Sequence, residues 1–162
     1  MNMKPFQKGY SLIEVSVVLA IIGVLVVVGL RAYRGYIQSE NIAAVDRQYG
    51  EAVSLVRATF DKRQKNSTIG HSIDAPSTGS SWIALLNQSS SVAPGDNSPA
   101  YISTVATKAT SLSGAVSVLA SDTSSVTITR PCYPSETVAG TLETTVITSG
   151  GVVSVTNRPC PP

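Results

Sequence analysis

A single carboxylate, that of Glu14, lies inside a long apolar run. Residues 10–30 have the sequence YSLIEVSVVLAIIGVLVVVGL, in which Glu14 is the one charged residue. An ionised carboxylate costs roughly 2.5–3.5 kcal/mol at the centre of a bilayer, and less near an interface. A buried carboxylate without a partner is costly, so an acid in such a run needs a positive charge nearby. Glu14 is therefore a candidate for charge pairing.

The other side chains with chemistry of their own are Cys132, Cys160 and His71. Two cysteines late in an exported chain predict one disulfide if the domain folds in an oxidising compartment; two unrelated buried thiols are the alternative. His71 has no second histidine or Cys-x-x-Cys motif near it, so we expect neither metal nor cofactor. No nucleophile–base pair and no phosphate-binding loop is evident, so no catalytic residue is predicted.

The apolar run has the length of a membrane span. Its 21 residues would form a helix of roughly 31 Å, against about 30 Å for a bilayer core. Lys4 and Lys8 precede it and favour a cytoplasmic N-terminus, although Arg31 and Arg34 follow it and weaken the bias. A secretory signal would have a shorter apolar region and a small-x-small cleavage site. A plain anchor would not explain Glu14, and a buried helix of a soluble protein is the third alternative.

The start of the run also carries a motif. Residues 8–14, KGYSLIE, followed by the aliphatic stretch, closely resemble the class III signal of type IV prepilins and pseudopilins. The resemblance implies that a prepilin peptidase cuts between Gly9 and Tyr10 and that the new amine of Tyr10 is methylated. Glu14 then corresponds to the glutamate at the fifth mature position. The short leader is similar to that of the type IVa-like branch, in which phenylalanine usually stands where this chain has Tyr10.

Charge pairing gives Glu14 a physical role in such a subunit. Lipid and aliphatic side chains are similarly apolar, so moving a helix from a bilayer into a bundle of identical helices gives assembly little direction. Glu14 can neutralise the N-terminal amine of a neighbouring subunit, and that amine exists only after the leader is removed. Because an unpaired buried carboxylate is costly, the pair acts mainly on register.

The helix is predicted to continue past the apolar run to about residue 65. Apolar residues recur there at helical spacing, with charged residues on the other faces; they are Tyr33, Ile37, Ala44, Val45, Tyr49, Ala52, Val53, Val56 and Phe60. In the family a glycine–proline pair often lets the first half of this helix melt during assembly. This chain has Gly23 and Gly29 but no proline between Tyr10 and Asp74, so melting at 23–29 is left undecided.

Strand signals dominate the end of the chain. Residues 66–110 are rich in Gly, Ser, Asn and Pro and predict a connecting region, in which Ser80-Ser81 could cap a short helix containing Trp82. Runs rich in Val, Ile and Thr, with a Ser149-Gly150-Gly151 turn between the last two, predict four antiparallel strands. These strands are expected at 115–120, 125–129, 142–148 and 152–156.

These elements predict an α+β fold of the pilin type. A long N-terminal helix has a protruding apolar half and an amphipathic half packed on a roughly four-stranded antiparallel sheet. The expected organisation is a leader at 1–9, a transmembrane and filament-core helix at 10–34, and a globular head at 35–162. The head comprises the second half of the helix at 35–65, the αβ-loop at 66–110, and the sheet with the disulfide-bounded C-terminal region at 111–162.

The resemblance implies a structural subunit of a type IV pilus rather than an enzyme, and an anchored enzyme is the distant alternative. Its partners would be identical subunits, prepilin peptidase, the inner-membrane assembly machinery and, before assembly, the membrane itself; contact with a host surface or DNA is unresolved. Localisation would change from the inner membrane to an extracellular filament.

Two alternatives lie within the family, a minor pilin and a type II secretion pseudopilin. Cys132 and Cys160 favour a pilin, because major pseudopilins typically lack this disulfide and use calcium.

Charged residues make up 14% of the chain and the net charge is +2, which argues against a dedicated nucleic-acid binder.

Overall fold

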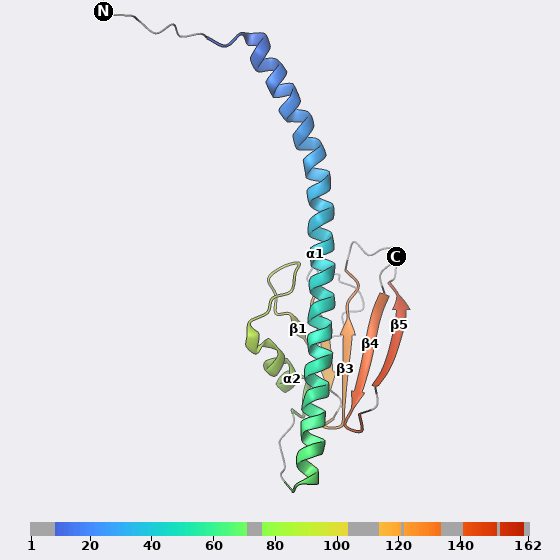
Figure 1. Cartoon of the computed structure of the whole chain (residues 1–162). Helices are drawn as coiled ribbons and strands as arrows, with labels where there is room; N and C mark the ends of the chain where they lie inside the picture. Colours follow the sequence, from blue (N-terminus) through green and yellow to red (C-terminus); the bar gives the residue numbers. More distant parts are fainter. Residues whose placement is uncertain are drawn as a thin grey trace, which may run out of the picture. The chain divides into compact units, whose positions relative to one another are not determined.

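The computed structural model describes residues 9–70, 76–103, 114–120, 122–133, 141–151 and 153–160. The chain divides into two compact units, Met1–Ser39 and Glu40–Pro162. Helices and strands follow in the order shown in Figure 1: α1 (Leu12–Thr68), α2 (Gly79–Leu86), a 3-10 helix η1 (Asn87–Ser89), β1 (Tyr101–Ile102), β2 (Val116–Ala120), β3 (Ser125–Arg130), β4 (Thr141–Thr148) and β5 (Val153–Pro159). The predicted α+β class is confirmed.

Helix α1 is continuous over 57 residues, because nothing in it forces a break. It contains no proline, and neither Gly23 nor Gly29 interrupts it. It runs slightly past the predicted end, since the hydroxyls of Ser67 and Thr68 donate to the carbonyl of Gln64 at 2.8 and 3.0 Å and extend the last turn. Gly70 then adopts a φ of 77°, a left-handed conformation that suits glycine and ends the helix.

In the second unit, one face of α1 forms part of the core. Its buried residues recur every three or four positions, as the sequence predicted for a helix with one face on a sheet; they are Val45, Gln48, Tyr49, Ala52, Val56 and Phe60. Tyr33 was expected on the same stripe, but it is 63% exposed. It belongs to the first unit, in which none of the described residues is buried.

The predicted short helix around Trp82 is present as α2. Its N-cap residue is Thr78, two positions before the expected Ser80-Ser81. Thr78 has an extended backbone and accepts a hydrogen bond from the Ser81 N–H, while the Ser81 hydroxyl accepts one from the Thr78 N–H. This reciprocal pair is a capping box. The cap directs Trp82 into the core, where it is fully buried and packs on Phe60 with ring centroids 5.6 Å apart.

The sheet has five strands in the order β1-β2-β3-β4-β5, one more than predicted. The four expected strands are β2 to β5 and pair antiparallel. The fifth, β1, pairs parallel with β2 through Tyr101 and Ile102 only. Two residues are too few for an alternating pattern, so the sequence prediction included them in the connecting region. β5 also runs to Pro159, which an edge strand tolerates because its outer N–H groups need no strand partner.

Side chains from both helices and the sheet make one core. In Figure 1, the teal-to-green part of α1 lies across the face of the sheet, and α2 lies beside it. Burying each large aliphatic side chain stabilises the fold by about 1.5–3 kcal/mol. The largest contributors from the sheet are Val116, Val118, Val126, Ile128 and Ile147.

Candidate functional site

The first unit of the chain presents an apolar helix surface with no cover from its own residues. The most apolar 18-residue window of α1 has a mean hydropathy of 2.8, and none of it is buried. By length and composition, α1 is the one helix among the described residues that could cross a membrane. Its exposed large side chains are Leu12, Ile13, Val15, Val17, Val18, Leu19, Ile21, Ile22, Val24, Leu25, Val26, Val27, Val28 and Leu30.

The helix begins just after the residues that the motif singles out. Gly9 and Tyr10 precede it and have no regular structure, and Tyr10 is 83% exposed. The carbonyl of Ser11 accepts hydrogen bonds from the N–H groups of Glu14 at 3.0 Å and Val15 at 3.2 Å, which closes the first turn. A side chain added at Gly9 would meet no atom within 4 Å. The folded chain itself therefore leaves room for other residues at this position.

Glu14 lies in the first turn of α1 and is exposed. A carboxylate near the N-terminus of a helix is favoured by the positive end of the helix dipole. The Glu14 carboxylate makes no hydrogen bond or ion pair with another residue in the described ranges. Ser16, half a turn further on, donates its hydroxyl proton to the Ile13 carbonyl at 2.8 Å. The carboxylate of Glu14 thus lies on the exposed surface of an otherwise apolar helix segment.

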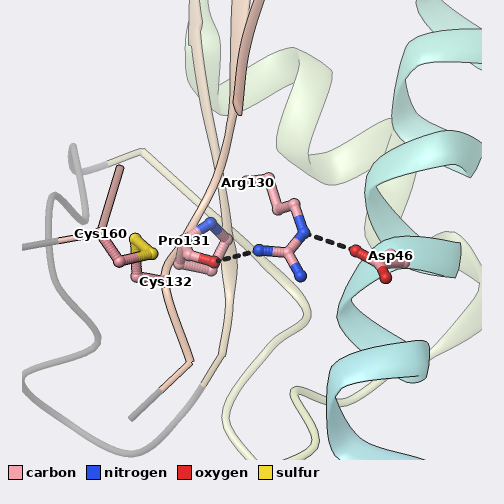
Figure 2. Close-up of polar contacts among 5 residues, drawn as sticks. All are labelled: Asp46, Arg130, Pro131, Cys132 and Cys160. Atoms are coloured by element: carbon pink, nitrogen blue, oxygen red, sulfur yellow. Dashed lines mark hydrogen bonds and ion pairs between the residues drawn. A yellow bond between two sulfur atoms is a disulfide. The ribbon is translucent and has the colours of Figure 1, made fainter. Parts of the chain in front are cut away.

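The second unit contains the predicted disulfide. Cys132 and Cys160 are bonded; their Cα atoms are 5.7 Å apart, and the residues are 28 positions apart in sequence. The alternative of two unrelated thiols is wrong. The bond joins the segment after β3 to the end of β5, so it closes the C-terminal region on itself (Figure 2).

Beside the disulfide, a charged pair connects the sheet to the helix. The Nε atom of Arg130 lies 2.5 Å from a carboxylate oxygen of Asp46 on α1, and its Nη1 donates to the Pro131 carbonyl at 3.2 Å (Figure 2). The Arg130 side chain is 7% exposed, whereas that of Asp46 is 56% exposed. The partly solvated carboxylate of Asp46 therefore balances the charge of the buried Arg130 guanidinium.

Neutral hydrogen bonds add to this connection. The Asn41 amide donates to the Tyr133 hydroxyl at 2.7 Å, and the Tyr49 hydroxyl bonds to the Thr145 hydroxyl. The Tyr101 hydroxyl donates to the Gln48 carbonyl at 3.0 Å. Burial raises the pKa of both Tyr49 and Tyr101 from 10.0 to about 12. Both phenols therefore stay neutral at physiological pH and make hydrogen bonds that connect α1 to the sheet.

Comparisons with known proteins agree with the N-terminal geometry. Residues 4–30 match the family model described as the prokaryotic N-terminal methylation motif. The type IV major fimbrial protein FimA of Dichelobacter nodosus is 33% identical over 70 residues, which are 42% of this chain and 45% of that relative. Another FimA from the same organism is 39% identical over 49 residues, covering 30% of this chain and 31% of that relative.

The N-terminal segment carries the prokaryotic N-terminal methylation motif, and the chain is similar to type IV major fimbrial proteins over part of its length. The chain spans less than half the length of the curated relatives that it matches. No solved structure matches the chain significantly. The likeness to FimA thus concerns part of the pilin sequence, while the α+β architecture of the remainder comes from the structure itself.

The structure places the predicted site residues in the two units of the chain, one group in each. Gly9, Tyr10 and Glu14 lie together at the start of α1, and Cys132 and Cys160 lie together at the end of the sheet. His71 lies outside the described residues. The Asp46–Arg130 pair was missed, because the charged residues of the helix were placed only on faces other than the apolar one and were given no partners. An arginine ending a strand of otherwise neutral residues was the signal that could have revealed it.

Small cavities flank Phe60 in the second unit. One, of about 250 Å³, is lined partly by Arg63, Gln64 and the hydroxyls of Thr123 and Ser124. The Arg63 guanidinium there already donates to the Thr123 carbonyl at 2.7 Å. Neither this cavity nor a neighbouring one of about 210 Å³ contains a histidine or cysteine among its lining residues. In the described part of the chain, no three His, Cys, Asp or Glu side chains are grouped for metal binding.

Proposed function

We propose that this chain is the structural subunit of a type IV pilus. In this proposal, prepilin peptidase cuts between Gly9 and Tyr10, the amine of Tyr10 is methylated, and subunits polymerise through the first half of α1. The observation that carries the proposal is the wholly exposed apolar surface of that helix, which lies within the residues 4–30 that match the methylation motif. The likeness to FimA, a major fimbrial protein, supports it.

The exposed surface requires a partner. Soluble monomers rarely expose contiguous apolar patches of more than a few hundred square ångströms, and here an 18-residue window of helix is exposed all round. Two environments can cover it: the acyl chains of a bilayer, and the same helix of other subunits. The proposed life cycle uses both, first as an inner-membrane precursor and then as an extracellular filament.

Glu14 would favour the transfer of the helix from the bilayer to the filament. Dispersion contacts in lipid and in a helix bundle are similar, so the apolar surface alone does not favour assembly strongly. The outward charge of Glu14 is unfavourable in both unless a cation meets it. The Tyr10 amine of a neighbouring subunit is such a cation once the leader has been cut. Cleavage would then create the charge that sets the register between subunits.

The described fold does not require glycine at position 9, so we assign the role of Gly9 to recognition by the peptidase. No atom of the described residues, apart from the two chain neighbours, lies within 4 Å of a Cβ placed at Gly9, and the residue precedes the helix. A requirement for glycine would therefore come from the enzyme that binds this segment. The proposed partners are that peptidase, the inner-membrane assembly machinery and identical subunits.

The disulfide favours a true pilin over a pseudopilin, as does the likeness to major fimbrial proteins. A minor pilin, which would prime or tip the fibre, is the alternative within this function. Adhesion, motility and DNA uptake are possible uses of the assembled filament.

Cleavage is tested by the N-terminus of the mature protein. Filaments sheared from cells that produce the chain should be visible by electron microscopy, and their subunit mass should equal residues 10–162 with one added methyl group and one disulfide.

Replacing Gly9 by valine should leave the precursor uncut. Because position 9 has open space, the variant should fold normally, and Gly35→Val, also in open space, serves as a control that is still processed. A mature protein beginning elsewhere than Tyr10 would contradict the proposal.

A further inference from the structure

We propose that Arg31, Tyr33, Arg34 and Tyr36 form an interfacial belt that binds the headgroup phosphates of phospholipids at the C-terminal end of the membrane span. The inference rests on the membrane stage of the proposed function and is independent of polymerisation. All four residues belong to the first unit of the chain and are exposed.

The position of the belt follows from the length of the apolar run. The run ends at Leu30, and α1 from its first residue, Leu12, to Leu30 spans roughly 28 Å, close to the thickness of a bilayer core. If Tyr10 lies at one boundary of the hydrocarbon core, Arg31 and the turn after it lie at the other. The headgroup phosphates of that leaflet are then level with the belt.

The two arginines point to an anionic partner. They are three positions apart on α1, so their side chains lie on the same side of the helix, where like charges repel. The neighbouring residues within one turn, 27–30 and 35–38, carry no charge. Neither guanidinium makes a hydrogen bond or ion pair with another residue in the described ranges. The planar donor fork of arginine matches the oxygens of a phosphate group.

The two tyrosines favour a lipid surface over an acidic protein surface. Tyr33 is 63% exposed and Tyr36 is 62% exposed. They are also three positions apart, and at 3.6 residues per turn they lie on the side of the helix opposite the arginines. Tyrosine is enriched at membrane–water interfaces, where its ring meets acyl chains and its hydroxyl meets water. A single acidic protein surface would cover one side, whereas a bilayer surrounds the helix.

The test measures the contact between arginine and phosphorus directly. The full-length chain, labelled with ¹³C at arginine Cζ, is reconstituted in bilayers of phosphatidylcholine and phosphatidylglycerol, and dephasing of the ¹³C signal by ³¹P is recorded in the solid state. Of the seven arginines in the chain, we expect Arg31 and Arg34 to be dephased. The variant R31Q/R34Q should lose that dephased fraction. The control R57Q removes an exposed arginine from the second unit and should retain it.

The outcomes separate this inference from the function on which it rests. Equal dephasing in the unsubstituted chain and in R31Q/R34Q would overturn the belt, provided that both float with vesicles. A chain that does not float would overturn both the belt and the membrane stage. If phosphate contact is absent but R31Q/R34Q lowers the yield of filaments, the arginines contact protein, and the lipid assignment is wrong while the proposed function stands.

Discussion

At Arg130 and Asp46, a single charged contact connects β3 to α1 in the second unit. The guanidinium is almost fully buried, and its neighbours are the Pro131 carbonyl and the Asp46 carboxylate. A buried cation that loses a hydrogen-bond acceptor bears a desolvation cost, which exceeds the small net gain of an exposed surface pair. Stability at this point therefore depends more on Asp46 than its own exposure indicates.

We expect Asp46→Asn to lower the free energy of unfolding by about 1–2 kcal/mol, because the buried guanidinium loses its counter-charge and keeps at most a hydrogen bond to a neutral amide. The measurement is guanidinium chloride unfolding of the chain in detergent, followed by the fluorescence of Trp82, which is the sole tryptophan and is fully buried. Asp61→Asn, at an exposed position of the same helix, should change the midpoint little. Equal midpoints for the two variants would mean that the Arg130 pair contributes no stability.

The buried phenols of Tyr49 and Tyr101 predict a loss of stability in alkali. Burial raises the pKa of each from 10.0 to about 12, so the folded state retains protons that the unfolded chain releases. Their contribution is fully present below pH 10 and is lost as the pH rises from 10 to about 12. The unfolding midpoint should fall over this range, and less so in the double variant Tyr49→Phe/Tyr101→Phe. An identical pH dependence in that variant would assign the effect to other groups.

Among the elements, those with a signal along the whole segment were predictable from the sequence. The second half of α1 has apolar residues at helical spacing, and strands β2 to β5 are rich in Val, Ile and Thr. Strand β1 was not predictable, because its two residues pair in the parallel sense with β2 through contacts distant in sequence. The cap at Thr78 was missed because several neighbouring hydroxyl residues, Ser80 and Ser81 among them, could serve equally well by type alone.

The candidate site divides in the same way. Gly9, Tyr10 and Glu14 were accessible from sequence because they form one short local motif. The Cys132–Cys160 bond could be predicted because the chain has only two cysteines. The Asp46–Arg130 pair could not, because it joins residues 84 positions apart, and no local pattern specifies which charges meet.

The disulfide should stabilise the C-terminal elements specifically. Closing a loop of 28 positions contributes on the order of 3–4 kcal/mol by the loop-entropy estimate. We expect Cys132→Ser/Cys160→Ser to lower the unfolding free energy by about this amount and to expose β5 to proteases, while the helical circular dichroism of α1 persists. Hydrogen exchange of the β5 amides, with the α1 amides as internal reference, provides the measurement. Unchanged exchange in β5 would contradict this role.

The whole molecule combines surfaces suited to two different surroundings. The first unit exposes an apolar helix that needs lipid or other subunits around it, and the second buries its own core and closes its end with a disulfide. The second unit thus has a core of its own, whereas the proposed assembly uses the surface of the first unit. On this division, changes at the start of α1 should affect filaments without affecting head stability.

The charge of Glu14 is the feature on which the proposed assembly depends, and Glu14→Gln removes that charge while keeping the shape of the side chain. The decisive measurement is the yield of sheared filaments relative to processed subunit in the membrane, in cells that produce this variant. We predict normal cleavage after Gly9, a normal head, and at least a tenfold loss of filaments, corresponding to about 1.4 kcal/mol or more. A filament yield equal to that of the unsubstituted chain would contradict pairing between Glu14 and the Tyr10 amine of a neighbouring subunit.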